Sequence, residues 1–99
     1  MNDYDSLVGS APTVLVEFYA SWCPHCRRMM PVVADVRELI GQTVPIYQLD
    51  IDQNQAAAEY AGAESVPTFI IYQNGKPVWR HSGEMEGNDL LQKIQQFAS

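Results

Sequence analysis

Two cysteines, Cys23 and Cys26, are the residues best suited to carry out chemistry, and they are separated only by Pro24 and His25. A thiolate is a nucleophile in disulfide exchange and a ligand for metal ions, and a free cysteine is also a common small core residue. A structural zinc site usually has four cysteine or histidine ligands, whereas this chain can add only His25 and His81. The spacing therefore favours a redox-active pair, with a metal site and two structural cysteines as the alternatives.

The elements that must position the pair are a strand before it and a helix after it. Residues 13–20 (TVLVEFYA) are rich in β-branched and aromatic side chains and are apolar on both alternating faces. This pattern predicts a central strand covered by helices on both sides, where the carboxylate of Glu17 is costly. After Cys23, apolar side chains recur at three- and four-residue steps until Gly41, which predicts a helix that is kinked near Pro31. The side chains of this apolar pattern are Met29, Val32, Val33, Val36, Leu39 and Ile40.

Cys23 lies at the junction where the predicted strand gives way to the predicted helix. Unpaired N–H groups and the helix dipole stabilise an anion at a helix N-terminus, so the pKa of this thiol is expected to be low. Pro24 suits the first helical position, and Cys26 follows on the same face of the first turn. The expected roles are Cys23 as the nucleophile and Cys26 as the thiol that resolves a mixed disulfide.

The rest of the chain alternates between short helices and strands. Asn54 is expected to cap a helix that ends at Gly62, Asn88 to cap the last helix, and Asn74-Gly75 to form a hairpin turn. In chain order the expected elements are a helical segment over 3–9, a strand over 44–51, a helix over 55–61, strands over 67–73 and 76–81, and a C-terminal helix. The order predicts one α/β domain over residues 1–99, with a mixed sheet of four or five strands sandwiched by about four helices.

Composition limits the class of protein. The 99 residues are 46% hydrophobic and 18% charged, which is typical of a globular domain. The net charge of −6 does not suit nucleic acid and favours a soluble monomer. No basic region precedes an apolar run, and no apolar stretch approaches the ~18 residues of a membrane span. The predicted location is the cytoplasm, or the periplasm or another extracytoplasmic space if a leader has been removed.

The segment VEFYASWCPHCRRMMPVV resembles the active-site segment of the thioredoxin family, and DIDQN, SVPTFIIYQNGK and SGEMEGNDLLQKI resemble later segments of that family in the same order. The resemblance implies a thioredoxin fold and a protein thiol–disulfide oxidoreductase active in cell redox homeostasis and electron transport. It implies no cofactor beyond the Cys23–Cys26 dithiol or disulfide. The implied partners are protein disulfides or dithiols and an electron donor, either a reductase or a membrane thiol carrier.

The same resemblance assigns residues around the pair. Pro67 matches a proline that is cis in thioredoxins and faces the cysteines, although the residues alone favour a trans proline that begins a strand. Trp22, Val66, Pro67 and Gly83 would form a shallow platform for substrate, made slightly more polar by Ser82. For Trp22 the alternative is a packed core aromatic.

Three departures from the family pattern concern the Pro24-His25 dipeptide, Glu17 and Gln48. Pro-His replaces the usual Gly-Pro and is typical of the oxidising DsbA family. His25, Arg27 and Arg28 are expected to stabilise the Cys23 thiolate, which would make the disulfide more oxidising than in a thioredoxin with Gly-Pro. The alternative is that His25 is exposed and neutral.

Glu17 matches a buried aspartate that is thought to assist proton transfer at the second cysteine. Burial is expected to raise the pKa of Glu17 toward the range of a general acid or base, unless its longer stem reaches water. Gln48 matches a lysine that commonly accompanies the aspartate, and a neutral Glu17 hydrogen-bonded to Gln48 is one possible arrangement.

Three classes of function follow. The favoured one is a thiol–disulfide oxidoreductase. The alternatives are a redox-inactive adaptor or chaperone-like binding module with the same fold, and a metal-binding thiol protein.

Overall fold

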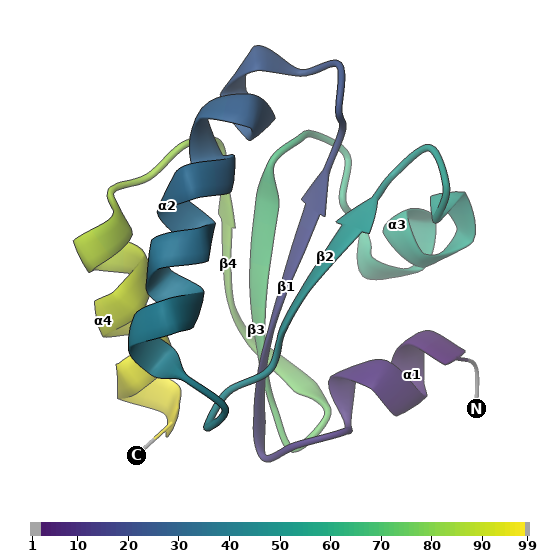
Figure 1. Ribbon diagram of the computed structural model, residues 1–99. Helices are drawn as coiled ribbons and strands as arrows, with labels where there is room; N and C mark the ends of the chain where they lie inside the picture. The colour runs from purple at the N-terminus through teal and green to yellow at the C-terminus, as the bar shows by residue number, and fades with distance from the viewer. Residues whose placement is uncertain (1–2, 99) are drawn as a thin grey trace.

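The computed structural model describes residues 3–98, which form four helices and four strands (Figure 1). In chain order these are α1 (Asp3–Val8), β1 (Thr13–Tyr19), α2 (Pro24–Ile40), β2 (Ile46–Asp50), α3 (Gln55–Ala61), β3 (Thr68–Gln73), β4 (Lys76–Ser82) and α4 (Gly87–Ala98). The predicted order of elements is confirmed.

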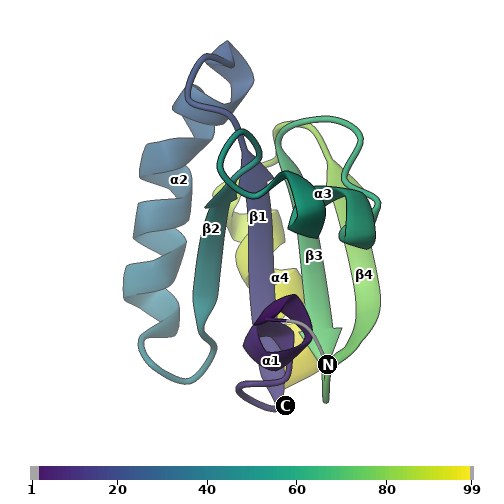
Figure 2. The same cartoon turned by 90° about the vertical axis from the view of Figure 1, so that its right-hand side faces the viewer.

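The four strands form one mixed sheet in the order β2-β1-β3-β4 (Figure 2). β1 pairs in parallel with β2 and antiparallel with β3, so it is central as its two apolar faces predicted. β3 and β4 form the antiparallel hairpin expected from Asn74-Gly75, both of which have positive φ. Pro77 lies on the edge strand β4, where its missing N–H is tolerated.

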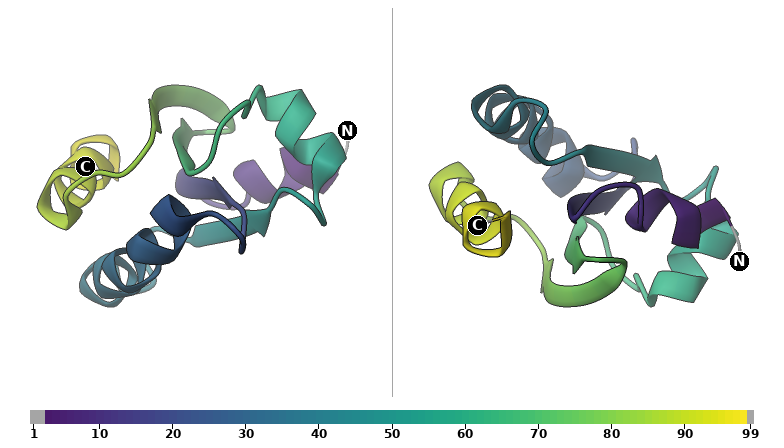
Figure 3. Two further views of the ribbon diagram at one scale, coloured as in Figure 1. Left: turned by 90° about the horizontal axis from the view of Figure 1, so that it is seen from above. Right: turned by 90° about the horizontal axis from the view of Figure 1, so that it is seen from below.

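Helices cover both faces of the sheet, as the views along the strands show (Figure 3). On one face, α2 and α4 pack over Leu15, Phe69 and Ile71. On the other, α1 and α3 pack over Val14, Val16 and Phe18, among others. Because alternate residues of a strand face opposite sides, Glu17 shares the α2 and α4 face with Leu15.

Some boundaries differ from the predictions. Asn88 does not precede the last helix: α4 begins at Gly87, because the N–H of Leu90 already bonds to the carbonyl of Glu86. Asn54 does precede α3, but its side chain makes no capping bond and donates to the carbonyl of Asp50 instead. The strand expected over 44–51 is shorter, at Ile46–Asp50.

Helix α2 ends at Ile40 and is capped by Gly41 as predicted; the φ of Gly41 is 68°, and its N–H donates to the carbonyl of Arg37. Pro31 lies inside α2, which runs as one helix from Pro24 to Ile40. Within residues 3–98, none of the helices combines the length and apolarity that a bilayer crossing requires.

Candidate active site

The two cysteines lie at the end of the sheet where β1 runs into α2. Cys23 is the residue before the helix, with extended backbone, and Pro24 takes the first helical position. The carbonyl of Cys23 already accepts the N–H of Arg27 at 3.0 Å, so the first turn begins at the thiol. The prediction that Cys23 lies at the strand–helix junction is confirmed.

The environment of Cys23 lowers its pKa below the ordinary value of a thiol. The backbone N–H of Cys26 makes the largest contribution, and the thiol of Cys26, the backbone N–H of His25 and the charge of Arg27 act in the same direction. Burial, which leaves Cys23 only 6% exposed, opposes them. This is the arrangement that favours a nucleophilic thiolate at a helix N-terminus.

Cys26 has the opposite behaviour. It is almost completely buried, and burial is the main reason why its pKa rises to about 11. The neighbouring Cys23 and the carboxyl of Glu17 raise it further, whereas the N–H of Ala20, which donates to Sγ at 3.4 Å, lowers it. Both cysteines are free thiols, so the structure shows the dithiol form.

The loop before β3 faces this pair. The Val66–Pro67 peptide bond is cis, and the thiol of Cys23 points to the carbonyl of Val66 at 3.9 Å. The N–H of Gly83 donates to the carbonyl of Pro67 at 2.8 Å, which ties the end of β4 to this loop. Gly83 has a φ of 100° and open space where a side chain would be, so a chain can approach its backbone.

Trp22 lies beside the pair and is 61% exposed, so its interpretation as a core aromatic is wrong. Its Nε1 donates to Oδ2 of Asp52 at 3.0 Å, which holds the ring on the surface of the loop after β2. On the β4 side, the hydroxyl of Ser82 lies 3.0 Å from that of Thr68, so it is already engaged in a hydrogen bond.

The ring of His25 belongs to an exposed ion cluster, which we define as His25, Arg28 and Glu84. Nδ1 of His25 lies 2.6 Å from Oε2 of Glu84, and Arg28 donates to both oxygens of that carboxylate at 2.7–3.1 Å. These contacts lower the pKa of Glu84 to about 2. The ring of His25 was expected to stabilise the thiolate of Cys23, but it contacts Glu84 and Arg28 instead. The part of His25 that lowers the pKa of Cys23 is its backbone N–H.

Beneath Cys26, Glu17 is fully buried, so the alternative that it reaches water is wrong. Its Oε1 accepts a hydrogen bond from Nε2 of Gln48 at 2.9 Å, while Oε2 is buried without a partner. Burial raises the pKa of Glu17, and the Gln48 hydrogen bond and the charge of Arg37 reduce that rise. Nη1 of Arg37 in turn donates to Oε1 of Gln48 at 3.2 Å.

Sequence reasoning missed three of these residues: Arg37, Asp52 and Glu84. Arg37 follows Cys26 by eleven residues, about three helical turns, so periodicity could have placed both on one face of α2. Loops from distant parts of the chain bring Asp52 to Trp22 and Glu84 to His25. No pattern in the sequence predicts these two contacts.

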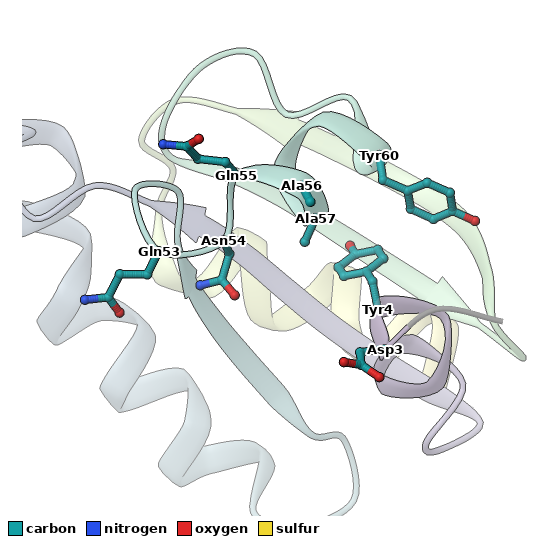
Figure 4. Close-up of a pocket in the computed structure, with 8 residues that line it drawn as sticks. All are labelled: Asp3, Tyr4, Gln53, Asn54, Gln55, Ala56, Ala57 and Tyr60. Atoms are coloured by element: carbon teal, nitrogen blue, oxygen red, sulfur yellow. The ribbon is translucent and has the colours of Figure 1, made fainter.

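A pocket of about 380 Å³ lies elsewhere, between α1 and α3 (Figure 4). None of its lining residues belongs to the cysteine site; they are Asp3, Tyr4, Gln53, Asn54, Gln55, Ala56, Ala57 and Tyr60. In the part of the chain that the structure describes, no three His, Cys, Asp or Glu side chains are grouped to hold a metal ion.

Comparisons with known proteins agree with this geometry. Thioredoxin Y, chloroplastic, of Oryza sativa subsp. japonica is 37% identical over 95% of this chain, which spans 56% of that protein. A thioredoxin-like protein of Synechocystis is 34% identical over 97% of this chain and 91% of its own length. The structure of a mutant thioredoxin from Halobacterium salinarum is 30% identical, with a TM-score of 0.86 over 100% of this chain and 86% of that one. The thioredoxin family model matches residues 1–96. Because the match covers nearly the whole sequence and the fold agrees over the full chain, this protein belongs to the thioredoxin family.

Proposed function

We propose that the protein is a thiol–disulfide oxidoreductase that acts on protein substrates through Cys23 and Cys26. The observation that carries this proposal is the contrast between two thiols in one helical turn. The pKa of Cys23, at the mouth of the site, is lowered, whereas that of Cys26, on its floor, is raised to about 11. Such a pair separates the attacking thiol from the thiol held in reserve.

The reaction begins when the Cys23 thiolate attacks one sulfur of a substrate disulfide. The substrate S–S bond breaks as a mixed disulfide with Cys23 forms, and the leaving sulfur takes a proton from solvent. Cys26 then passes its proton to the carboxylate of Glu17, and its thiolate attacks Sγ of Cys23. The Cys23–Cys26 bond forms, and the second substrate sulfur leaves as a thiolate that takes a proton from solvent, while Glu17 releases the proton of Cys26 to solvent. Two electrons have passed to the substrate, and a partner dithiol restores the pair by the reverse exchange.

The loop before β3 and the end of β4 are the proposed docking surface for an extended substrate chain. The backbone of Val66, beside Pro67, would pair with that chain as in strand addition, and Gly83 leaves room for it. The exposed ring of Trp22 would cover the substrate from the other side. In this proposal Pro67 contacts the reacting sulfurs.

We further propose that the Pro24-His25 dipeptide makes the disulfide more oxidising than Gly-Pro would. The lowered pKa of Cys23 supports this, because a stable thiolate stabilises the dithiol form. A double variant, Pro24→Gly with His25→Pro, is expected to shift equilibration with glutathione toward the disulfide form of the protein. An unchanged equilibrium would remove the dipeptide from the explanation.

The proposed partners are protein disulfides or dithiols and either a reductase or a membrane thiol donor. Nucleic acid does not fit the net charge of −6. We propose that residues 1–99 act as one monomeric domain in the cytoplasm, with an extracytoplasmic space as the alternative. Fractionation of cells that express the tagged protein from its own gene tests the compartment.

Insulin reduction by dithiothreitol, followed as turbidity, tests the activity. The protein should accelerate it, and Cys23→Ser should remove the acceleration and leave the rate of dithiothreitol alone, since the nucleophile is lost. Pro77→Ala, on the edge strand away from the cysteines, is the matched control and should keep the activity. A wild type that binds insulin chains without accelerating the reaction would instead identify a redox-inactive adaptor.

A further inference from the structure

The strongest unassigned feature is a chain of hydrogen bonds that runs from an exposed cation to the buried acid. Arg37, exposed on α2, donates Nη1 to Oε1 of Gln48 at 3.2 Å and Nη2 to the carbonyl of Ile46 at 2.8 Å. Nε2 of Gln48 then donates to Oε1 of Glu17 at 2.9 Å. The chain is continuous, and it ends on a carboxyl group whose second oxygen has no partner among residues 3–98.

The amide of Gln48 has a direction, and Arg37 determines it. A guanidinium only donates hydrogen bonds, so the oxygen of the amide must face Arg37 and the NH₂ group must face Glu17. An NH₂ donor stabilises the ionised carboxylate. If the amide turned over, its oxygen would face Glu17 and stabilise the protonated acid, while its NH₂ group would face the donors of Arg37. The bond from Arg37 to Ile46 holds the guanidinium in place for this task.

Among residues 3–98, Arg37 is the charged side chain that lowers the pKa of Glu17. On α2, the groups that interact with Glu17 are the cation Arg37 and the thiol of Cys26. On the neighbouring strands, the residues paired with Glu17 are Gln48 of β2, which is uncharged, and Phe69 of β3, which is apolar. The hydrogen bond from Gln48 and the charge of Arg37 are the contributions that lower the pKa of Glu17 against burial.

We propose that Arg37 is a positioning residue: by holding the NH₂ group of Gln48 toward Glu17, it keeps that carboxyl group able to ionise when Cys26 must give up its proton. The influence of a cation on α2 thus reaches Glu17 through the amide of Gln48 on β2. This inference deepens the proposed function, because the role of Glu17 in proton transfer belongs to that function. The direction of the Gln48 amide is independent of the proposed function.

The direct measurement is the titration of the Glu17 carboxyl carbon, followed by NMR in protein labelled with ¹³C-glutamate and kept in the dithiol form. Glu17→Gln assigns the signal. In Arg37→Gln the titration should move to higher pH. Lys76→Gln, which removes one exposed positive charge from β4, is the matched control and should leave it unmoved. Circular dichroism confirms that each variant is folded.

A double-mutant cycle with Gln48→Leu separates the amide from a direct charge effect. If Arg37 acts through the amide, Arg37→Gln should have little further effect once Gln48 is leucine. An unmoved titration in Arg37→Gln, or an effect that persists in full in the Gln48→Leu background, would overturn the proposal.

The second readout is the rate at which Cys26 resolves a preformed mixed disulfide on Cys23, measured from pH 6 to 9. At pH 7 we expect Arg37→Gln to be about three- to tenfold slower, the order of one lost ordinary hydrogen bond. If the carboxyl titration moves while this rate profile stays unchanged, the positioning by Arg37 stands and the proposed role of Glu17 in proton transfer fails. The two ideas are therefore tested separately.

Discussion

The mouth and the floor of the active site both contain a glutamate, yet they treat it in opposite ways. At the mouth, Glu84 is exposed and contacts the guanidinium of Arg28 and the ring of His25, and its pKa falls to about 2. On the floor, Glu17 is fully buried with one neutral partner and a cation one step removed, and its pKa rises. The two sulfurs follow the same division, since the pKa of Cys23 is lowered and that of Cys26 is raised.

The difference between the two glutamates indicates that burial matters more than the number of nearby charges for the effect of those charges on a thiol. Water screens the exposed ion cluster, and side-chain entropy opposes its order, so such pairs contribute little. On the floor, water is excluded and each hydrogen bond or missing partner has a larger effect. We therefore expect changes on the floor to alter the chemistry more than changes at the mouth, apart from the nucleophile itself.

The largest effect should come from removing the floor sulfur. Cys26→Ser keeps the features that lower the pKa of Cys23 through the backbone, so attack on a substrate should continue. Resolution should fail, so the acceleration of insulin reduction should be lost while a mixed disulfide accumulates on Cys23. Mass spectrometry of the protein with a small aromatic disulfide measures this species. Turnover near the wild-type rate would show that the two sulfurs do not divide the work as proposed.

How far the sequence predicts this site follows from the same contrast. Cys23 and Cys26 could be placed because local periodicity put both on the first turn of one helix, and Glu17 because the strand around it is apolar on both faces. The ion cluster could not be predicted, because 59 residues separate His25 from Glu84 and only the packed loops bring them together. The fold was predictable for the same reason as Cys23, Cys26 and Glu17, because hydrophobic patterns and turn residues act over short stretches of sequence.

Details of the ends were less predictable. The start of α4 depends on which carbonyl takes the first helical hydrogen bond, and Asn54 found a competing partner in the backbone of Asp50. The orientation of the Gln48 amide depends on Arg37, which no pattern in β2 reveals. Hydrogen-bond partners between elements are therefore the part that needed the structure.

The second prediction concerns the stability of the floor. Because the pKa of Glu17 is raised in the folded state, the folded protein binds more protons than the unfolded chain between the two pKa values. The contribution of Glu17 to stability is therefore fully present below its ordinary value of 4.5 and is lost as the pH rises through the folded value. Glu17→Gln does not titrate, so it should be about 1–3 kcal/mol more stable than the wild type at pH 8, the scale of an unsatisfied buried group, and equal to it at pH 4.

Urea unfolding at pH 4, 6 and 8 measures this difference. Glu38→Gln, which neutralises an exposed carboxylate on the same helix as Cys26, is the control and should follow the wild type throughout. A constant offset between Glu17→Gln and the wild type at all three pH values would mean that the ionisation of Glu17 is not its cause.

The smallest effect should come from the mouth. Glu84→Gln removes the carboxylate that His25 and Arg28 share, but both side chains remain in solvent, and the backbone N–H of Cys26 still makes the largest contribution to the low pKa of Cys23. We expect the rate of Cys23 alkylation by iodoacetamide at pH 6 to change by less than about fivefold, as for other exposed ion pairs. Glu86→Gln, in the same loop, separates a specific contact from a general change in charge. A tenfold change in Glu84→Gln alone that persists at high salt, where exposed charges are screened, would contradict the contrast. The exposed ion cluster would then affect the chemistry as much as the hydrogen bonds that connect Arg37, Gln48 and Glu17.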